Sequence, residues 1–570
     1  MLNENFVKDI IKSMSIEEKT GAMMTLGFAG VVPKNNVYEY INKYHCGGLR
    51  LSPEVRNFGS YVDPKSGKAI MDIGDFSGIK YSKRSPVCKP SYYRNVLRDL
   101  QREARNRKSG IPLHFSTDME GGTSTDPLFN EMVYFPKPMG IRATGKPSRA
   151  YEIALAQGKQ LKSMGINWIH SPVLDVNSNP NNPEIYNRSY SDKAEDVYIY
   201  AKETCRGFKD AGIITTGKHF PGRGSSHVDA HFSEPRIEAD LQDLKKRDLY
   251  PYFKLFEDNV LPAVMIAHSV YDSLDPERMA TFSHKIIHEL LRGKMGFDGV
   301  VTSDSMTMAA IVKEYGVPEG CVMALEAGAD LVLMKAETNL VGETFEAILK
   351  AIKDGRLKEE FVDQKIGRIL KLKMDYGLFD EEDQAAPDPD TVICDARFSE
   401  LADEVAKESL YIYKSNDLPL SADDQSVLVI EQKIKHYNLI SWHSGQFYER
   451  LQTHNPYVHY LETDFVYDEA DKTNIERLVD KHDTIIMTSY FLRGNRKNLD
   501  YLNELLDRFP QKCFIFVTNT PYETLSIPSK ANNVLITFSM APAAFLNAAD
   551  VIFGYGEANG DWPLYGPNKG

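Results

Sequence analysis

Short apolar runs alternate with longer stretches of helical periodicity from the N-terminus to about residue 375. Each run is apolar at its start and ends in polar, charged or glycine residues. The alternation predicts repeated βα units around a parallel sheet, and polar carboxyl ends are typical of barrel strands that open into a site. The pattern therefore predicts an α/β fold with an N-terminal (β/α)8 barrel of the TIM type. Its eight expected strands lie within residues 21–30, 46–53, 112–122, 166–177, 212–222, 263–273, 296–306 and 328–337.

A second α/β region follows an acidic, proline-bearing segment at residues 379–392. Short apolar runs there are separated by segments of helix length, which predicts an open α/β sheet, either doubly wound or part of a sandwich. We therefore divide the chain into a barrel domain at 1–378, a linker at 379–400 and a C-terminal α/β domain at 401–570. This last domain has no glycine-rich phosphate loop, so its sequence does not support nucleotide binding. Its expected strands include residues 426–430, 483–491, 513–520 and 533–540.

Composition places the chain among globular proteins. Of its 570 residues, 42% are hydrophobic and 26% are charged, close to the average for soluble domains. Acidic residues outnumber basic ones by 80 to 67, and no stripe of lysine and arginine interrupts this excess, which argues against a nucleic-acid or membrane partner. The start of the chain lacks a signal-peptide pattern, and the six cysteines are scattered. We expect a cytoplasmic protein with reduced thiols, unless a signal has been trimmed from it.

The densest group of reactive side chains lies at the end of the fifth expected strand, in the segment KHFPGRGSSHVDAH at residues 218–231. Its three histidines and its aspartate are metal-ligand types, but their spacing is irregular, and the neighbouring Lys218 and Arg223 would repel a cation. A solvated surface loop is a second interpretation. The third is a dyad in which Asp229 orients His231 as a general acid/base near neutral pH.

Charged and polar residues also end several other expected strands. Asp304 stands where the seventh apolar run meets the barrel mouth, and capping of the next helix is its alternative role. Asp118, Asp175, Arg188 and His268 lie at or just past other strand ends. Because the carboxyl ends of barrel strands meet at one face, we expect a hydrogen-bonding pocket of mixed charge there. Such a pocket suits a neutral, polyhydroxylated ligand such as a sugar.

The ordered set of motifs resembles glycoside hydrolase family 3, and within it the β-N-acetylhexosaminidase branch. The resemblance covers nearly the entire chain, and it implies a (β/α)8 barrel followed by a C-terminal α/β domain. The motifs that carry it are DMEGG at 118–122, GINWIHSPVLDVNSNPNNP at 165–183, NRSYSD at 187–192, KHFPGRG at 218–224 with Asp229-Ala-His231, AHSVYDSLD at 267–275, LRGKMGFDGVVTSDSM at 291–306 and YGLFD at 376–380.

The resemblance implies a retaining exo-β-N-acetylglucosaminidase that forms a covalent glycosyl-enzyme intermediate. Asp304 matches the family's nucleophile, which attacks the anomeric carbon. His231 matches the acid/base that protonates the leaving oxygen and then activates water, and Asp229 is its dyad partner. Members of the branch usually have the sequence Asp-Ser-His here, so Ala230 lacks one hydroxyl but both members of the dyad are present.

Substrate contacts follow from the same resemblance. Lys218 and His219 match a pair that hydrogen-bonds sugar hydroxyls, Asp118 matches a carboxylate that grips hydroxyls far from the reacting carbon, and Arg188 matches a substrate-binding arginine. We add His268 to this set from its position at a strand end. The expected partner is a small molecule or oligosaccharide with a terminal N-acetylglucosamine, and no metal or other cofactor is expected. The oligomeric state is left open.

Two departures from the branch bear on specificity. Asp126 stands where the branch usually has an arginine, and an insertion at about 56–110 follows the second expected strand, where it can roof the pocket. The neutral imidazole of a histidine acid/base also does not repel an incoming anion, so phosphorolysis is an alternative to hydrolysis in the same site. A glycan-binding relative with weak or no turnover is the other alternative.

Overall fold

We describe a computed structural model of the chain over residues 4–53, 88–122, 132–228, 235–335, 339–380, 387–433, 445–492 and 497–566. Four residues singled out in the sequence lie outside these described residues: Asp126, Asp229, Ala230 and His231. Residues 56–87 of the expected insertion lie outside them as well, and the described part of that insertion contains a helix at Pro90–Arg105.

Eight parallel strands form the barrel, and all eight strands predicted from the sequence are confirmed. They are β1 (Met24–Ala29), β2 (Gly48–Ser52), β3 (His114–Thr117), β4 (Trp168–Ile169), β5 (Thr216–Phe220), β7 (Ala263–Ile266), β10 (Val300–Ser305) and β11 (Leu331–Met334). Their hydrogen-bonded order is β4-β3-β2-β1-β11-β10-β7-β5. Isolated parallel bridges join Trp168 to Ile214 and Val173 to Lys218. These bridges connect the two ends of the sheet, so the barrel closes.

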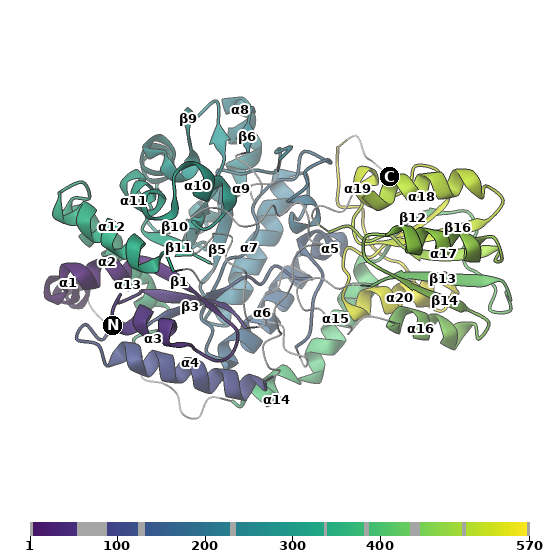
Figure 1. Ribbon diagram of the computed structural model, residues 1–570, viewed down its shortest axis with the longest axis horizontal. Helices are drawn as coiled ribbons and strands as arrows, with labels where there is room; N and C mark the ends of the chain where they lie inside the picture. Colours follow the sequence, from purple (N-terminus) through teal and green to yellow (C-terminus); the bar gives the residue numbers. More distant parts are fainter. Residues whose placement is uncertain are drawn as a thin grey trace.

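Helices surround these strands (Figure 1). The barrel domain contains α1 (Glu4–Ser13), α2 (Ile16–Ala22), α3 (Asn35–Asn42), α4 (Pro90–Arg105), α5 (Pro138–Ala143), α6 (Pro147–Ser163), η2 (Tyr186–Arg188), α7 (Ala194–Asp210), α8 (Leu241–Asp243), η3 (Leu244–Asp248), α9 (Tyr250–Glu257), η4 (Ala280–Phe282), η5 (Lys285–Lys294), α10 (Ala309–Glu314), α11 (Val317–Ala327), α12 (Val341–Lys353) and α13 (Glu359–Asp375). Local sequence signals explain where several of these helices begin. Proline opens α4, α5 and α6, where its missing N–H loses no helical hydrogen bond.

A small sheet stands beyond the end of the barrel, beside α8 (Figure 1). It consists of β6 (Arg236–Ile237), β8 (Val270–Tyr271) and β9 (Asp275–Met279). β6 pairs with β8 in parallel, and Val270 N donates a hydrogen bond to Pro235 O at 2.9 Å. The chain that follows residues 229–234 is therefore fastened to the loop that follows β7.

The C-terminal domain is built on one six-stranded sheet, with the order β12-β17-β16-β15-β13-β14. Its elements, from the end of the barrel onward, are α14 (Pro389–Ile393), α15 (Ala396–Ser409), β12 (Tyr411–Ser415), β13 (Val427–Gln432), α16 (Gln446–His454), β14 (His459–Thr463), α17 (Glu469–Val479), β15 (Thr484–Thr488), α18 (Lys497–Arg508), β16 (Cys513–Thr518), α19 (Glu523–Ser526), β17 (Asn533–Ile536) and α20 (Pro542–Ile552). Every pair is parallel except β12 with β17. The described part of the expected linker forms α14 and the start of α15.

Both faces of this sheet are covered by helices, as a doubly wound domain requires. Val427 and Val429 of β13 belong to a buried cluster with side chains of α16 and α20, whereas Leu428 and Ile430 belong to another with side chains of α17 and α18. The second cluster also contains Met139 and Ala143 of α5 and Tyr186 of η2. The two domains thus share part of one core, at the boundary where Figure 1 shows α5 and α19.

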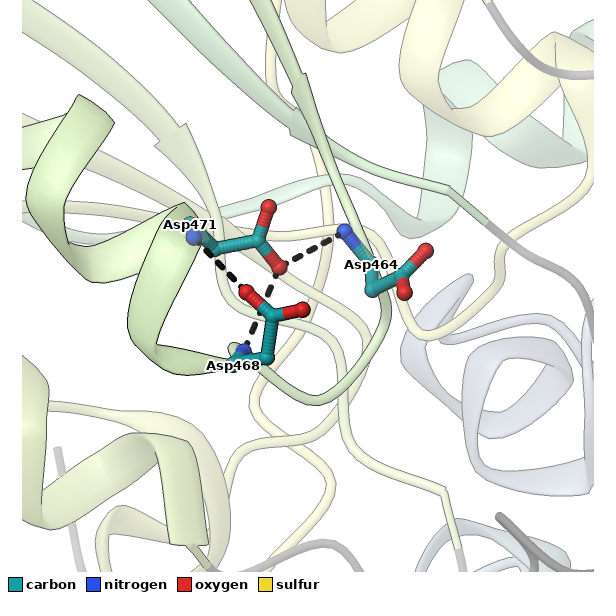
Figure 2. A group of neighbouring side chains, drawn as sticks. All are labelled: Asp464, Asp468 and Asp471. Carbon is teal, nitrogen blue, oxygen red and sulfur yellow. Dashed lines mark hydrogen bonds between the residues drawn. The ribbon is translucent and has the colours of Figure 1, made fainter.

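The described residues contain one group of carboxylates close enough to hold a metal ion, namely Asp464, Asp468 and Asp471. Figure 2 shows why they meet: Asp468 and Asp471 form a capping box at the start of α17, and Asp471 also accepts a hydrogen bond from Asp464 N at 3.1 Å. Capping of the helix accounts for this cluster. No helix in the described part of the chain is both long enough and apolar enough to span a membrane.

Candidate active site

Charged side chains from several barrel strands meet at the carboxyl end of the sheet. Asp118 follows β3, Lys218 and His219 lie on β5, Asp304 lies on β10, and Lys335 follows β11. The structure therefore brings together most of the described site residues that the sequence predicted, through a network of hydrogen bonds and ion pairs. The strands supply these positions because all eight run in the same direction.

Three cations surround the carboxylate of Asp118. Lys218 Nζ lies 3.0 Å from its Oδ1, Lys335 Nζ lies 3.1 Å from its Oδ2, and Arg50 Nη2 also donates to Oδ2. Burial favours the neutral acid, but Lys218, Arg50 and Lys335 outweigh burial and hold the pKa of Asp118 well below its usual value. Asp118 is therefore an anion with strongly polarised oxygens.

Arg188 is held by two glutamates. Its Nε and Nη2 donate to the two carboxylate oxygens of Glu120 at 2.8 and 3.0 Å, and its Nη1 donates to Glu184 O at 3.2 Å. Lys218 Nζ lies 2.5 Å from Glu120 Oε1, so this carboxylate joins Arg188 to the group around Asp118. Burial raises the pKa of Glu120, but Arg188 and Lys218 outweigh it and bring that pKa to about 2.

His219 is a neutral imidazole fixed by Asp175. The His219 Nδ1 and Asp175 Oδ2 atoms lie 2.7 Å apart. Burial, together with Arg223 and Arg188, lowers the pKa of His219 well below its usual value, whereas burial raises the pKa of Asp175 to about 6. At pH 7 the Nδ1–H therefore donates to the Asp175 carboxylate, which leaves a lone pair on Nε2. That nitrogen lies 3.9 Å from Asp304 Oδ2 and can accept a hydrogen bond from a ligand hydroxyl.

Asp304 lies at the carboxyl end of β10, and its side chain extends into this group. Its Oδ1 accepts a hydrogen bond from Ser305 N at 2.7 Å, and its Oδ2 lies 3.6 Å from Arg223 Nη2. Arg223 is buried and donates to Glu184 Oε1 at 2.8 Å, so its guanidinium spans the two carboxylates. The side chain of Asp304 stays 13% exposed, which leaves the carboxylate accessible to a ligand.

His268 contacts residues in the wall of the barrel. Its side chain is fully buried, its Nδ1 lies 2.7 Å from Thr281 Oγ1, and its Nε2 lies 3.1 Å from Ser305 O. The ring therefore holds the residue that follows Asp304. Direct substrate binding by His268 stays a prediction.

Sequence reasoning did not select four charged residues of this network: Arg50, Glu120, Glu184 and Lys335. Lys335 carries the same signal that selected Asp304, a charged residue at the carboxyl end of an apolar run, whereas Arg50 is a charged residue between two leucines of such a run. Glu120 lies in the DMEGG motif but was not singled out. Glu184 lies in a long irregular segment where nothing in the sequence marks its partner, and only the fold brings it to Arg223.

Residues 229–234, which include Asp229 and His231, lie outside the described residues, and hydrogen bonds hold the described residues on either side of them. On the near side, Asn179 Nδ2 donates to Ser226 O at 2.8 Å and Asn182 Nδ2 donates to Arg223 O at 3.0 Å. On the far side, β6 pairs with β8. The described residues on either side of this gap are therefore held by the loops that follow β4 and β7.

Neutralising Asp118 should weaken the folded protein. Asp118→Asn leaves three cations without their shared anion, and loss of one partner from a buried ion pair costs about 3–5 kcal/mol. We expect a clear fall in melting temperature in a thermal melt followed by circular dichroism. Asp375→Asn is the matched control. Asp375 and Lys371 form an exposed ion pair on one helix, and such a pair contributes less than about 1 kcal/mol to the free energy of unfolding. Equal melting temperatures for the two variants would contradict the network.

The chain forms a (β/α)8 barrel, and ionised and polar side chains gather at the carboxyl face of that barrel. This is the face at which barrel enzymes carry their active sites. Comparison with known families agrees with this placement. The model described as the N-terminal domain of glycosyl hydrolase family 3 matches residues 15–372, which is more than half of the chain. The chain belongs to glycosyl hydrolase family 3.

Known proteins similar to the chain carry related names. A β-hexosaminidase A from Pseudoalteromonas piscicida is 32% identical over 354 residues, which are 58% of this chain and 58% of that protein's length. A β-hexosaminidase from Tolumonas auensis is 36% identical over 236 residues, 41% of this chain and 68% of that protein. Among solved structures, a family 3 β-N-acetylglucosaminidase from a Paenibacillus species has a TM-score of 0.83 at 27% identity, covering 97% of this chain and 99% of that one.

Proposed function

We propose that the protein is a retaining exo-β-N-acetylglucosaminidase. The observation that carries the proposal is the placement of Asp304, an accessible carboxylate at the carboxyl end of β10 that is held by Ser305 N and faces Arg223 and the neutral His219. A carboxylate needs no separate base to act as a nucleophile. The relatives named β-hexosaminidase and the similar β-N-acetylglucosaminidase structure support the choice of sugar.

The reaction has two displacement steps. Asp304 attacks the anomeric carbon while the bond to the leaving oxygen breaks, and His231 gives its proton to that oxygen. The product of this step is a glycosyl ester of Asp304. Water then attacks the same carbon, His231 takes the proton of the water, and the ester bond to Asp304 breaks, so the released sugar keeps its β configuration.

The ion-pair network holds the sugar for this attack. Asp118 is ionised and can accept hydrogen bonds from hydroxyls remote from the reacting carbon, and Lys335, with 31% of its side chain exposed beside Asp118, can donate to them. His219 offers the lone pair of Nε2. Such remote contacts bring the anomeric carbon to Asp304 in a fixed orientation, which lowers the barrier without bond changes of their own.

Two buried cations of the site that could attract a phosphate are already paired with carboxylates. Lys218 contacts both Asp118 and Glu120, and Arg223 donates to Glu184. An incoming phosphate would have to compete with these buried carboxylates for each cation. Water is therefore the acceptor we propose, and phosphorolysis is treated as an outcome of the test.

Initial rates on 4-nitrophenyl N-acetyl-β-D-glucosaminide test the proposal, beside the matching β-glucoside and β-xyloside, each measured with and without phosphate and with and without EDTA. We expect turnover of the N-acetyl substrate that neither phosphate nor EDTA alters, with free N-acetylglucosamine as product. A sugar 1-phosphate as product would show a phosphorylase instead. No turnover of any substrate, combined with measurable sugar binding, would favour a glycan-binding protein.

A further inference from the structure

The turn that presents Arg188 cannot maintain its own conformation. Within η2, Tyr186 has a φ of +32°, in the left-handed region that a tyrosine rarely adopts. Such a conformation persists only where surrounding contacts over-determine it. The next residues of the turn are Asn187 and Arg188, so whatever holds Tyr186 and Asn187 also sets where the Arg188 guanidinium lies.

The C-terminal domain supplies two of these holding contacts. The ring of Tyr186 is buried and packs edge-on against Phe491, with ring centres 5.2 Å apart. Asn187 is fully buried, and its Nδ2 donates to Asn519 O at 2.7 Å. From the barrel side, Lys137 Nζ donates to the Tyr186 hydroxyl at 2.8 Å.

Phe491 and Asn519 act as one unit. They follow the neighbouring strands β15 and β16, at the carboxyl ends of the second sheet. The side-chain amide of Asn519 pairs with both backbone groups of Phe491: Phe491 N donates to its Oδ1 at 2.8 Å, and its Nδ2 donates to Phe491 O at 2.9 Å. The residue that receives Asn187 therefore also fixes the residue that packs on Tyr186.

A second hydrogen bond joins the start of the same loop to the C-terminal domain. Asn177, two residues after Asp175, donates from Nδ2 to the hydroxyl of Tyr522 at 2.7 Å, and its backbone N–H donates to Ser191 O at 3.2 Å. The segment between Asp175 and Ser191 is thus fastened to the C-terminal domain near both of its ends. This segment includes Glu184, which holds both Arg188 and Arg223.

We propose that Asn519, together with Phe491, is a positioning residue that holds Arg188 in its substrate-binding place. The C-terminal domain then contributes to sugar binding without touching the sugar, and this inference rests on the proposed function for the role of Arg188. The pair Arg188–Glu120 lies on the pocket side of the turn, and Asn187–Asn519 lies on the domain side. Release of the second pair frees the first to shift.

Asn187→Ala and Asn519→Ala test this in the full-length protein. The first removes the hydrogen bond to the main-chain oxygen of Asn519, whereas the second keeps that oxygen but removes the two hydrogen bonds that fix Phe491. Loss of an interaction that binds ground state and transition state equally raises KM and leaves kcat unchanged. We expect KM for 4-nitrophenyl N-acetyl-β-D-glucosaminide to rise about tenfold in each variant, as for the loss of about one hydrogen bond, with kcat within about threefold of wild type. The double variant should raise KM no further than the larger single change, since both act through one turn.

Asn533→Ala is the matched control. Asn533 is also a buried asparagine of the same sheet, but it lies at the start of β17, away from the barrel. Its Nδ2 donates a hydrogen bond to Phe514 O at 3.1 Å, and its Oδ1 accepts one from Asp417 N at 2.8 Å. We expect this variant to lose stability without a change in KM. An unchanged KM in both Asn519→Ala and Asn187→Ala would overturn the proposal, because a purely structural role lowers the folded fraction and not the affinity of folded molecules.

Hydrogen–deuterium exchange provides a readout that needs no turnover. The amides of Arg188 and Ser189 donate to Ile185 O and Tyr186 O within the turn, at 2.8 and 3.3 Å. We expect the peptide over 184–192 to exchange faster in Asn519→Ala and Asn187→Ala but not in Asn533→Ala. Unchanged exchange in the first two variants would overturn the positioning role of Asn519, even if the wild-type protein turned over no glycoside. Faster exchange in these variants, without turnover by the wild-type protein, would refute the proposed function alone.

Discussion

Asp304→Asn lowers kcat/KM for 4-nitrophenyl N-acetyl-β-D-glucosaminide by about 10⁴-fold, which is the largest effect we expect from a single substitution. The amide has the shape of the carboxylate but lacks the charge and the nucleophilic oxygen, so the covalent intermediate does not form. The hydrogen bond from Ser305 N and the contact with Arg223 leave the asparagine in the same place. Initial-rate kinetics on the purified variant measure the loss.

A trapping experiment ties this loss to the covalent step. A 5-fluoro N-acetylglucosaminyl fluoride should add one sugar to the wild-type protein, detectable as a mass increase on the peptide that contains Asp304, and should add none to Asp304→Asn. Asp298→Asn is the matched control, because Asp298 is exposed and lies just before the opposite end of β10. It should keep the wild-type kcat/KM. An adduct on any other carboxylate would assign the nucleophile elsewhere.

His231→Ala is expected to show the second largest effect, and its size should depend on the leaving group. An alkyl N-acetylglucosaminide needs a proton on its leaving oxygen, so kcat/KM should fall about 10²- to 10⁴-fold. A 2,4-dinitrophenyl glycoside leaves without that proton and should lose less than about tenfold in the same parameter. Rates across a series of aryl leaving groups measure the difference as a steeper dependence on leaving-group pKa.

Rescue by azide and a second histidine make this prediction specific. Azide needs no general base, so it should restore breakdown of the intermediate in His231→Ala and yield the β-glycosyl azide. His227→Ala is the control within the same loop, because the exposed His227 contacts Asn179. It should leave the dependence on leaving-group pKa unchanged. Full activity of His231→Ala on an alkyl glycoside would show that another group is the acid.

Much of the fold could be predicted from the order of residues. The eight barrel strands and four strands of the second sheet, β13, β15, β16 and β17, were visible as short apolar runs, because a strand buried on both faces needs apolar side chains at successive positions. β14 was missed because it lies at the sheet edge, where most of its side chains are exposed or half-buried and the apolar run is lost.

The candidate site was partly readable in the same way. Asp118, Lys218, His219 and Asp304 stand at strand ends, and the common direction of barrel strands is enough to bring such residues to one face. His268 shows the limit of that argument. A strand end predicts that a side chain is near the face, but whether it reaches the pocket or turns into the wall depends on its neighbours, here Thr281 and Ser305.

The sequence by itself thus determined the barrel, the second α/β domain and the family motifs, since these follow from local periodicity and from residues close together in the chain. Only the tertiary structure decided which charges are paired. Glu120 reaches Arg188 across 68 positions and Asn187 reaches Asn519 across 332. No local pattern encodes such partners, because the distance between two side chains far apart in the chain is set by how the elements between them pack. The same packing decides which cations remain available to a ligand.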